Sequence, residues 1–276
     1  MAENLTHTNA SASTSGILFS ALRLRAPLVQ CITNYVAMNF AANVLLATGA
    51  SPAMVHSSEE AGEFASFADA LTINIGTLSP EWLDGMLLAA KAATSVNTPW
   101  VLDPVAHHAT AFRRRAVAEL LELRPTVIRG NASEIIALAG GETNSRGVDS
   151  KDGTDMAEGC AKALAQATQA VIAVTGAVDF VTDGKRATRI LGGSPLMTHV
   201  TAMGCALTCL VGAFTAISRD DPFTATVAAL SCFGAAGANA ACEASGPGSF
   251  SWRFLDALAM LDNQSINAQA RPVTSF

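Results

Sequence analysis

Five short apolar runs in this chain end in residues that can bind a charged ligand. The residues that directly follow them are Asn34, Gly76 with Thr77, Asp103, Arg129 to Asn131, and Thr175. Ligands of open parallel sheets bind beyond the carboxyl ends of the strands, so these residues are expected to converge on one edge. A carboxylate, a guanidinium, an amide and backbone N–H groups together suit a polyanion with a divalent cation. Each of these residues alone is weak evidence for a ligand site. An Asp before Pro, for example, often only forms a turn.

The segment from Asn131 to Glu134 has two interpretations. Asn is a favoured N-cap, and Glu three residues later completes a capping box for a following helix. Alternatively, Glu134 contacts Mg²⁺ through the waters that this ion keeps when it binds phosphates. Both interpretations can hold together, because the helix N-terminus that needs a cap also attracts anions.

The segment from Val200 to Leu207 is a turn of small residues that enters a long apolar helix. Such a turn directs unpaired backbone N–H groups outward and can stabilise charge on a transferring phosphoryl group. Cys205 is expected in the first helical turn, where the helix dipole favours a thiolate. The competing interpretation is that this cysteine only fills space in the core. Space filling is the better explanation for Cys209.

Several common kinds of site are missing from the sequence. The five histidines have no metal-ligand spacing, and no Walker A, dinucleotide-binding or GxSxG motif occurs at a useful place. The six cysteines include no CxxC pair and no secretory leader precedes them, which predicts a reduced, cytoplasmic setting.

The elements that must position these residues alternate along the chain. Short β-rich runs and helical stretches follow one another from Pro27 to Val174, which predicts an α/β fold with a mostly parallel central sheet and helices on both faces. Asp183–Gly184 then predicts a hairpin turn. The apolar stretch Thr224–Ala244 contains too many small and polar residues for a lipid-facing span and is expected to be a buried helix.

Composition narrows the possible partners. The chain has 276 residues, of which 50% are hydrophobic and 14% charged, and its net charge is −6. This balance provides no basic surface for nucleic acid or an anionic membrane. The low charge content indicates an oligomer interface. We expect a disordered tail over residues 1–16 and a single domain over residues 17–276.

Seven ordered segments carry a family resemblance. They are PLVQCITN from Pro27, TGASPAM from Thr48, INIGTL from Ile73, PWVLDPV from Pro99, IRGNASE from Ile128, VTGAVDFVTDG from Val174 and PLMTHVTAMGCAL from Pro195. Together they resemble hydroxyethylthiazole kinase, and the resemblance extends from about Pro27 to Leu258. It implies a ribokinase-like fold, a homotrimer, and transfer of the ATP γ-phosphoryl group to 4-methyl-5-(2-hydroxyethyl)thiazole in thiamine biosynthesis or salvage.

The resemblance also implies residue roles. On the nucleotide side, ATP contacts are expected from Arg129, Thr175 and Asn131, and Mg²⁺ contacts from Asp103 and Glu134. The catalytic position falls on Gly204 and Cys205, with the role of the thiol as a base left open. The thiazole pocket, near a subunit boundary, is expected to include Met54, Ala202, Asn34, Gly76 and Thr77.

One segment departs from the family pattern. The family has Gly-Thr-Gly-Cys where this chain has Ala202-Met203-Gly204-Cys205. If the first family glycine takes a positive φ, Ala202 strains or reshapes the turn. Met203 is expected to place an apolar chain beside the phosphate path. The departure predicts reduced turnover or an altered acceptor pocket in an intact fold.

Two alternative functions remain open at this point. A kinase of the same fold could act on another heteroaromatic alcohol, such as hydroxymethylpyrimidine. A catalytically weak paralogue could bind thiazole or nucleotide as a sensor or a structural subunit, as the altered turn allows.

Overall fold

One large sheet forms the centre of the molecule. The computed structural model describes residues 13–141, 154–269 and 271–274. These residues form a nine-stranded sheet with the order β2-β1-β3-β4-β5-β6-β7-β8-β9. All pairs from β2 through β6 are parallel, and those from β6 through β9 are antiparallel. The mostly parallel α/β fold is therefore confirmed.

The bounds of the elements fix where each strand ends. The strands are β1 (Leu28–Ile32), β2 (Ser51–Ala53), β3 (Ala70–Asn74), β4 (Trp100–Asp103), β5 (Val127–Asn131), β6 (Val171–Thr175), β7 (Asp179–Thr182), β8 (Ala187–Leu191) and β9 (Arg271–Thr274). The helices are α1 (Thr14–Arg25), α2 (Met38–Thr48), α3 (Ala61–Phe67), α4 (Pro80–Ser95), α5 (Ala111–Glu122), α6 (Ala132–Leu138), α7 (Thr154–Thr168), α8 (Met203–Ile217), α9 (Pro222–Glu243), α10 (Pro247–Met260) and α11 (Asn263–Gln269), with short 3₁₀ turns η1 (His107–Ala109) and η2 (Pro195–His199).

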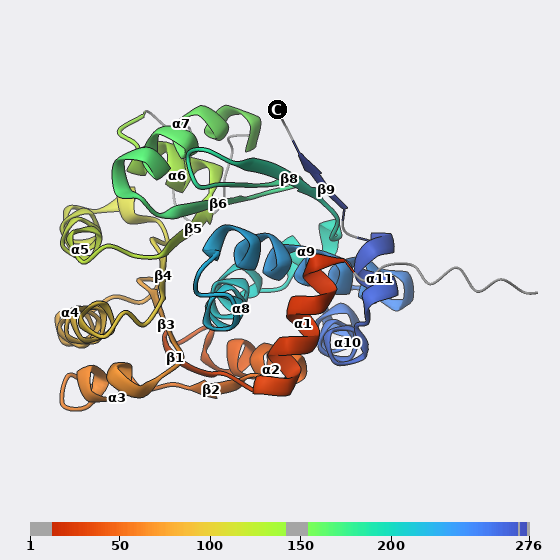
Figure 1. Ribbon diagram of the computed structural model, residues 1–276, viewed down its shortest axis with the longest axis horizontal. Helices are drawn as coiled ribbons and strands as arrows, with labels where there is room; N and C mark the ends of the chain where they lie inside the picture. Colours follow the sequence, from red (N-terminus) through yellow and green to blue (C-terminus); the bar gives the residue numbers. More distant parts are fainter. Residues whose placement is uncertain (1–12, 142–153, 270, 275–276) are drawn as a thin grey trace, which may run out of the picture.

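Helices cover both faces of the sheet. In Figure 1, α3, α4 and α5 line one face, while α8, α2, α1 and α10 cover the other. Successive strand residues point to opposite faces, so the apolar strands supply two cores. Val101 and Val127 pack into the core with α8, and their neighbours Leu102 and Ile128 pack into the core with α4.

The N-terminal boundary in the sequence prediction is wrong. Helix α1 begins at Thr14, inside the stretch expected to be a tail through Gly16. The Ser13 side chain accepts a hydrogen bond from the Gly16 N–H, and Phe19 and Leu22 bury the helix against the core. This cap and these two apolar anchors order the segment. Residues 1–12 of the expected tail lie outside the described residues.

Helix α9 confirms the expectation of a buried helix. It is long and apolar enough by composition to cross a membrane, but 67% of its most apolar stretch is buried inside the protein. It packs against α8, α1 and α10. The apolar residues of α9 therefore form part of the hydrophobic core.

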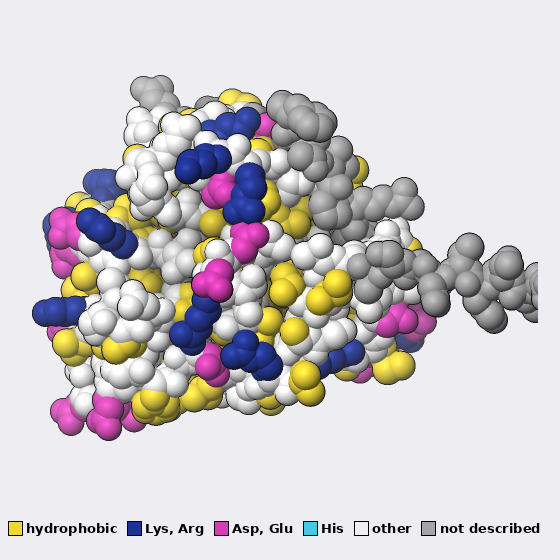
Figure 2. Space-filling model, in the orientation of Figure 1, with side chains coloured by type: hydrophobic (Ala, Val, Ile, Leu, Met, Phe, Trp, Pro, Cys, Tyr) yellow, Lys and Arg dark blue, Asp and Glu magenta, His cyan; other side chains and the backbone are white. Residues whose placement is uncertain are grey.

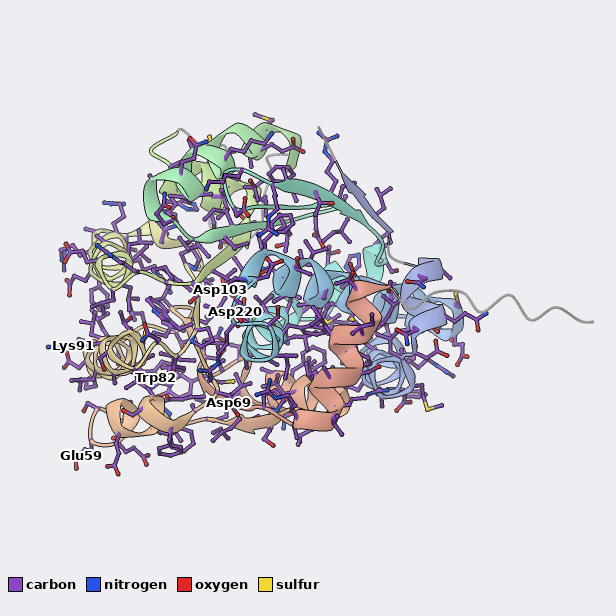
Figure 3. The ribbon with its side chains drawn as sticks, viewed as in Figure 1. Glu59, Asp69, Trp82, Lys91, Asp103 and Asp220 are labelled. Atoms are coloured by element: carbon purple, nitrogen blue, oxygen red, sulfur yellow. The ribbon has the colours of Figure 1, made fainter. Side chains whose placement is uncertain are left out.

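The parallel strands begin at one edge of the sheet, where Asp69 directly precedes β3 (Figure 3). Figure 2 shows acidic and basic side chains that alternate in a band down one face of the molecule. Exposed ion pairs join Arg186 to Asp183 and Asp221. The mixed signs leave no large basic patch on this face.

Candidate active site

The ends of five neighbouring parallel strands meet at the opposite edge, as the sequence predicted. Hydrogen bonds cross from strand to strand there. Asn34 Nδ2 donates to Asn74 Oδ1 at 2.8 Å, and Asn74 Nδ2 donates to Asp103 Oδ2 at 2.7 Å. Arg129 Nη1 lies 3.5 Å from the same Asp103 oxygen, and Arg129 Nη2 donates to Thr175 Oγ1 at 2.5 Å. One polar chain therefore connects β1, β3, β4, β5 and β6.

Asp103 lies at the centre of this chain, between β4 and α8 (Figure 3). It is fully buried, and Thr208 of α8 donates to its Oδ2 at 2.8 Å. Its Oδ1 has no hydrogen-bond partner among the described residues. Burial raises the pKa of Asp103, and Arg129 opposes that rise. A buried carboxylate oxygen without a partner is costly, so this position suits a cation.

Glu134 shows that the capping interpretation is correct. Asn131 Oδ1 accepts from the Glu134 N–H at 2.9 Å, and Glu134 Oε2 accepts from the Asn131 N–H at 2.8 Å. Glu134 Oε1 also accepts from the Ala106 N–H at 2.9 Å, which ties α6 to the loop after β4. Burial, and then the charge of Asp103, raises the pKa of Glu134 to about 7.

The carboxylates of Asp103 and Glu134 fit Mg²⁺. The two buried carboxylates interact electrostatically, Arg129 pairs with Asp103 at 3.5 Å, and the charge of Arg113 acts on Glu134, but Asp103 Oδ1 has no hydrogen-bond partner among the described residues. No cluster of three or more His, Cys, Asp or Glu side chains with metal-site geometry exists in the part of the chain that the structure describes. Mg²⁺ usually needs no such cluster, because it takes one or two carboxylates together with phosphates and waters.

Gly204 allows the arginine to approach α8. A Cβ atom built on Gly204 would lie 2.7 Å from both Nη atoms of Arg129. The guanidinium therefore packs directly on the first turn of the helix, where backbone N–H groups have no intrahelical acceptor. Two kinds of anion-binding group, one charged and one backbone, are thus adjacent.

Cys205 lies beside the Asn34 end of the polar chain. Asn34 Nδ2 donates to its Sγ at 3.3 Å. Burial, followed by the charge of Asp103, raises the pKa of this thiol to about 11. Cys205 lies in the first turn of α8 as expected, but burial and the charge of Asp103 oppose the thiolate that the helix dipole would favour. At neutral pH the group is a thiol.

The turn before α8 has the strain that the sequence suggested. Ala202 is the N-cap and has φ 66° and ψ 4°, in the left-handed region. Met203 differs from its prediction, because its side chain is 5% exposed and packs into the core under α8 instead of lining the phosphate path. Of the two residues that depart from the family pattern, Ala202 therefore affects the backbone of the turn and Met203 affects the packing of the core.

The expected acceptor residues are brought together only in part. Gly76 packs against Asn34, since a Cβ on it would lie 2.6 Å from Asn34 Nδ2. Thr77 Oγ1 accepts from the Tyr35 N–H at 3.1 Å. Met54 follows β2, the strand next to β1, and packs partly buried on the core that contains α2 and α8.

Sequence reasoning missed Asn74 and Thr208. Asn74 is the last residue of β3, two positions before Gly76, and the strand-end rule could have identified it. Thr208 lies one helical turn after Gly204, on the side of α8 that faces Asp103. A polar residue four positions along a helix from a candidate site is the signal that would have indicated it.

A family model and individual relatives of known proteins both match this chain over most of its length. The model of the "Hydroxyethylthiazole kinase family" matches residues 19–264. A hydroxyethylthiazole kinase from Rhizobium johnstonii is 70% identical, covering 94% of this chain and 97% of that relative. One from Gemmatimonas aurantiaca is 59% identical, covering 91% and 90%.

Solved structures agree with the sequence comparisons. A structure of hydroxyethylthiazole kinase protein from Pyrococcus horikoshii OT3 is similar with a TM-score of 0.88 and 39% identity, covering 95% of this chain and 99% of that one. A pyridoxal kinase from Staphylococcus aureus in complex with ADP has a TM-score of 0.58 and 17% identity, covering 77% and 88%, which shows a shared fold only.

Proposed function

The chain belongs to the hydroxyethylthiazole kinase family, and on that premise we propose that it transfers the γ-phosphoryl group of ATP to the hydroxyl group of 4-methyl-5-(2-hydroxyethyl)thiazole. The observation that carries the proposal is the position of Asp103. Its buried carboxylate has one unpartnered oxygen, with Arg129 on one side and the start of α8 on the other. A site of this kind suits the phosphates of a magnesium nucleotide.

The nucleotide side consists of Arg129, Thr175 and Asn131. Arg129 neutralises phosphate charge, and its hydrogen bond to Thr175 holds the guanidinium over the end of β6. Asp103 and Glu134 would hold Mg²⁺, which when bound supplies positive charge to the phosphate oxygens. The first turn of α8, at Gly204 and Cys205, directs N–H groups at the transferred group.

The acceptor side consists of Asn34, Gly76, Thr77, Met54 and Ala202. The Cys205 thiol between the two sides stays protonated at neutral pH, so it positions groups through Asn34 and does not act as a base. Catalysis then rests on alignment of the alcohol with the phosphorus and on charge stabilisation.

A coupled assay of ADP release tests this function. We expect turnover with the thiazole alcohol and Mg-ATP, and much lower kcat/KM with hydroxymethylpyrimidine. A preference for the pyrimidine would assign the chain to the alternative kinase. Tight binding of thiazole without ADP release would identify a binding paralogue.

We also propose a cytoplasmic homotrimer with the acceptor pocket near a subunit boundary. Tyr35 and Val36 follow Asn34 directly and are 70% and 58% exposed, which leaves an apolar surface beside the site. All six cysteines lie in the described part of the chain and are free, which supports a reducing compartment. Native mass spectrometry of the full chain tests the trimer, and a monomer would contradict it.

A further inference from the structure

Arg113 bridges two strand ends at the candidate active site. It lies in the first turn of α5 and is half-buried. Its Nη1 donates to the carbonyl of Ile75 at 2.8 Å and to that of Val105 at 2.7 Å, and its Nη2 donates to the carbonyl of Gly76 at 2.6 Å. One guanidinium therefore joins the segment after β3 to the segment after β4.

The sheet itself cannot make this connection. The register between β3 and β4 ends at the pair Asn74 and Asp103, and beyond it only a long 3.4 Å bond from the Ile75 N–H to the Asp103 carbonyl remains. The segment after β3 then leads to α4 at Pro80, and the segment after β4 leads to η1 at His107. Carbonyls that leave a ladder need other donors. Arg113 supplies them.

Both bridged segments carry groups of the site. The Gly76 N–H donates to Asn74 Oδ1 at 2.9 Å, and Gly76 packs on the Asn34 amide. The residue after Val105 is Ala106, whose N–H binds Glu134 Oε1. The segment after β3 thus lies on the acceptor side, and the segment after β4 lies on the side assigned to magnesium.

We propose that Arg113 is a positioning residue that sets the distance between the acceptor side and the magnesium side of the site. This inference rests on the proposed function. The planar guanidinium has five donors in a fixed arrangement, which matches three carbonyls in a way that a lysine ammonium does not. Misplacement of reacting groups by about 1 Å costs about a hundredfold in rate, so loss of the bridge should affect catalysis without any direct substrate contact.

Arg114 is a matched control. It is the next residue on the same helix, it is exposed, and its Nη1 donates to the carbonyl of His108. Removal of its side chain deletes the same charge and one carbonyl contact but leaves the bridge intact.

Steady-state kinetics test the proposal. We expect Arg113→Ala to raise KM for the thiazole alcohol about tenfold and to lower kcat about tenfold or more, with a smaller change in KM for ATP. Guanidinium at millimolar concentration should restore part of the lost kcat/KM in Arg113→Ala only. Arg113→Lys should show smaller changes of the same kind, with KM for the thiazole alcohol rising more than KM for ATP. If the alanine variant does not fold, this difference between the two KM values in Arg113→Lys tests the proposal. The proposal would be overturned if the Arg113 variants had the same kinetics as Arg114→Ala. It would also be overturned if guanidinium did not restore any of the kcat/KM that Arg113→Ala loses.

Amide hydrogen exchange provides a test that needs no turnover. The amides of Gly76 and Ala106 should exchange faster in Arg113→Ala than in Arg114→Ala, because the carbonyl bridge holds both segments. Equal exchange in the two variants would overturn the proposed bridge. If the wild-type protein does not phosphorylate the thiazole alcohol, the proposed function fails while this comparison still tests the bridge.

Discussion

Asn34 donates from one amide nitrogen to both Cys205 Sγ, at 3.3 Å, and Asn74 Oδ1, at 2.8 Å. The first contact joins the end of β1 to the first turn of α8, and the second joins it to β3. Asn74 in turn donates a hydrogen bond to Asp103, and Asp103 forms an ion pair with Arg129. Hydrogen bonds therefore connect the proposed acceptor side to the proposed nucleotide side, and a change at one end should be measurable at the other.

Replacement of Arg129 by alanine should weaken nucleotide binding. The variant loses the guanidinium at Thr175 and leaves Asp103 buried without its cation. We expect KM for ATP to rise at least about tenfold, which is roughly 1.4 kcal/mol, and KM for the alcohol to rise less. Arg124→Ala is the control, because Arg124 is an exposed arginine that precedes β5 at the opposite edge. An equal rise in both KM values would contradict the assigned role.

Replacement of Cys205 by serine should preserve most of the activity. The pKa of about 11 keeps the thiol protonated over the working range, so its ionisation is not needed. Serine keeps an acceptor for Asn34, and we expect kcat within about tenfold and an unchanged pH profile between about pH 7 and pH 9. Cys242→Ser, at an exposed position, controls for thiol loss. Disappearance of an alkaline limb in the Cys205 variant would show that the thiolate takes part.

Replacement of Ala202 by glycine should relieve backbone strain at the start of α8. A non-glycine residue at φ 66° costs about 1 kcal/mol, and glycine returns part of it as stability. We expect a higher free energy of unfolding and a changed kcat/KM for the alcohol, most clearly together with Met203→Thr. Ala26→Gly is the control, because Ala26 has φ 44° at the end of α1, away from the site. Unchanged kcat/KM in the double variant would contradict a role for this turn in catalysis.

His107 should make the protein sensitive to acid. Burial, and then the neighbouring charge of His108, lowers the pKa of His107 from 6.5 to about 4. The unfolded chain therefore binds the proton first, and stability that is present above pH 6.5 is lost as the pH falls toward 4. A shift of this size corresponds to a free energy on the order of 3 kcal/mol.

Urea unfolding at several pH values measures this effect. His107→Gln should lose less stability than the wild type between about pH 7 and pH 4.5. His199→Gln, at an exposed position, should follow the wild type. Parallel curves for all three proteins would show that His107 does not carry the acid sensitivity.

Much of the fold could be predicted because local patterns and burial agree. The apolar runs at Val29 and Ile172 lie in strands covered on both faces, so their composition identifies them without any partner. The hairpin at Gly184 has the expected positive φ of 84°. Helix α1 could not be predicted, because its ordering depends on the distant core that receives Phe19 and Leu22.

The candidate site could be predicted as a set of positions but not as an arrangement. Strand ends are visible in sequence, so Asp103, Arg129 and Thr175 were found. The roles of Asn74 and Arg113 depend on which strands are neighbours and on where their ladder ends. The protonation of Cys205 depends on burial by segments far away in the chain.

The amino-acid sequence alone determined the order of strands and helices, the residues at the strand ends and the family, because these are properties of contiguous residues. Only the tertiary structure decided that Asp103 keeps one oxygen unpartnered, that Met203 turns into the core, and that Arg113 bridges β3 to β4. Hydrogen bonding and desolvation act through space, and their strength is set by neighbours that the linear order of residues does not specify.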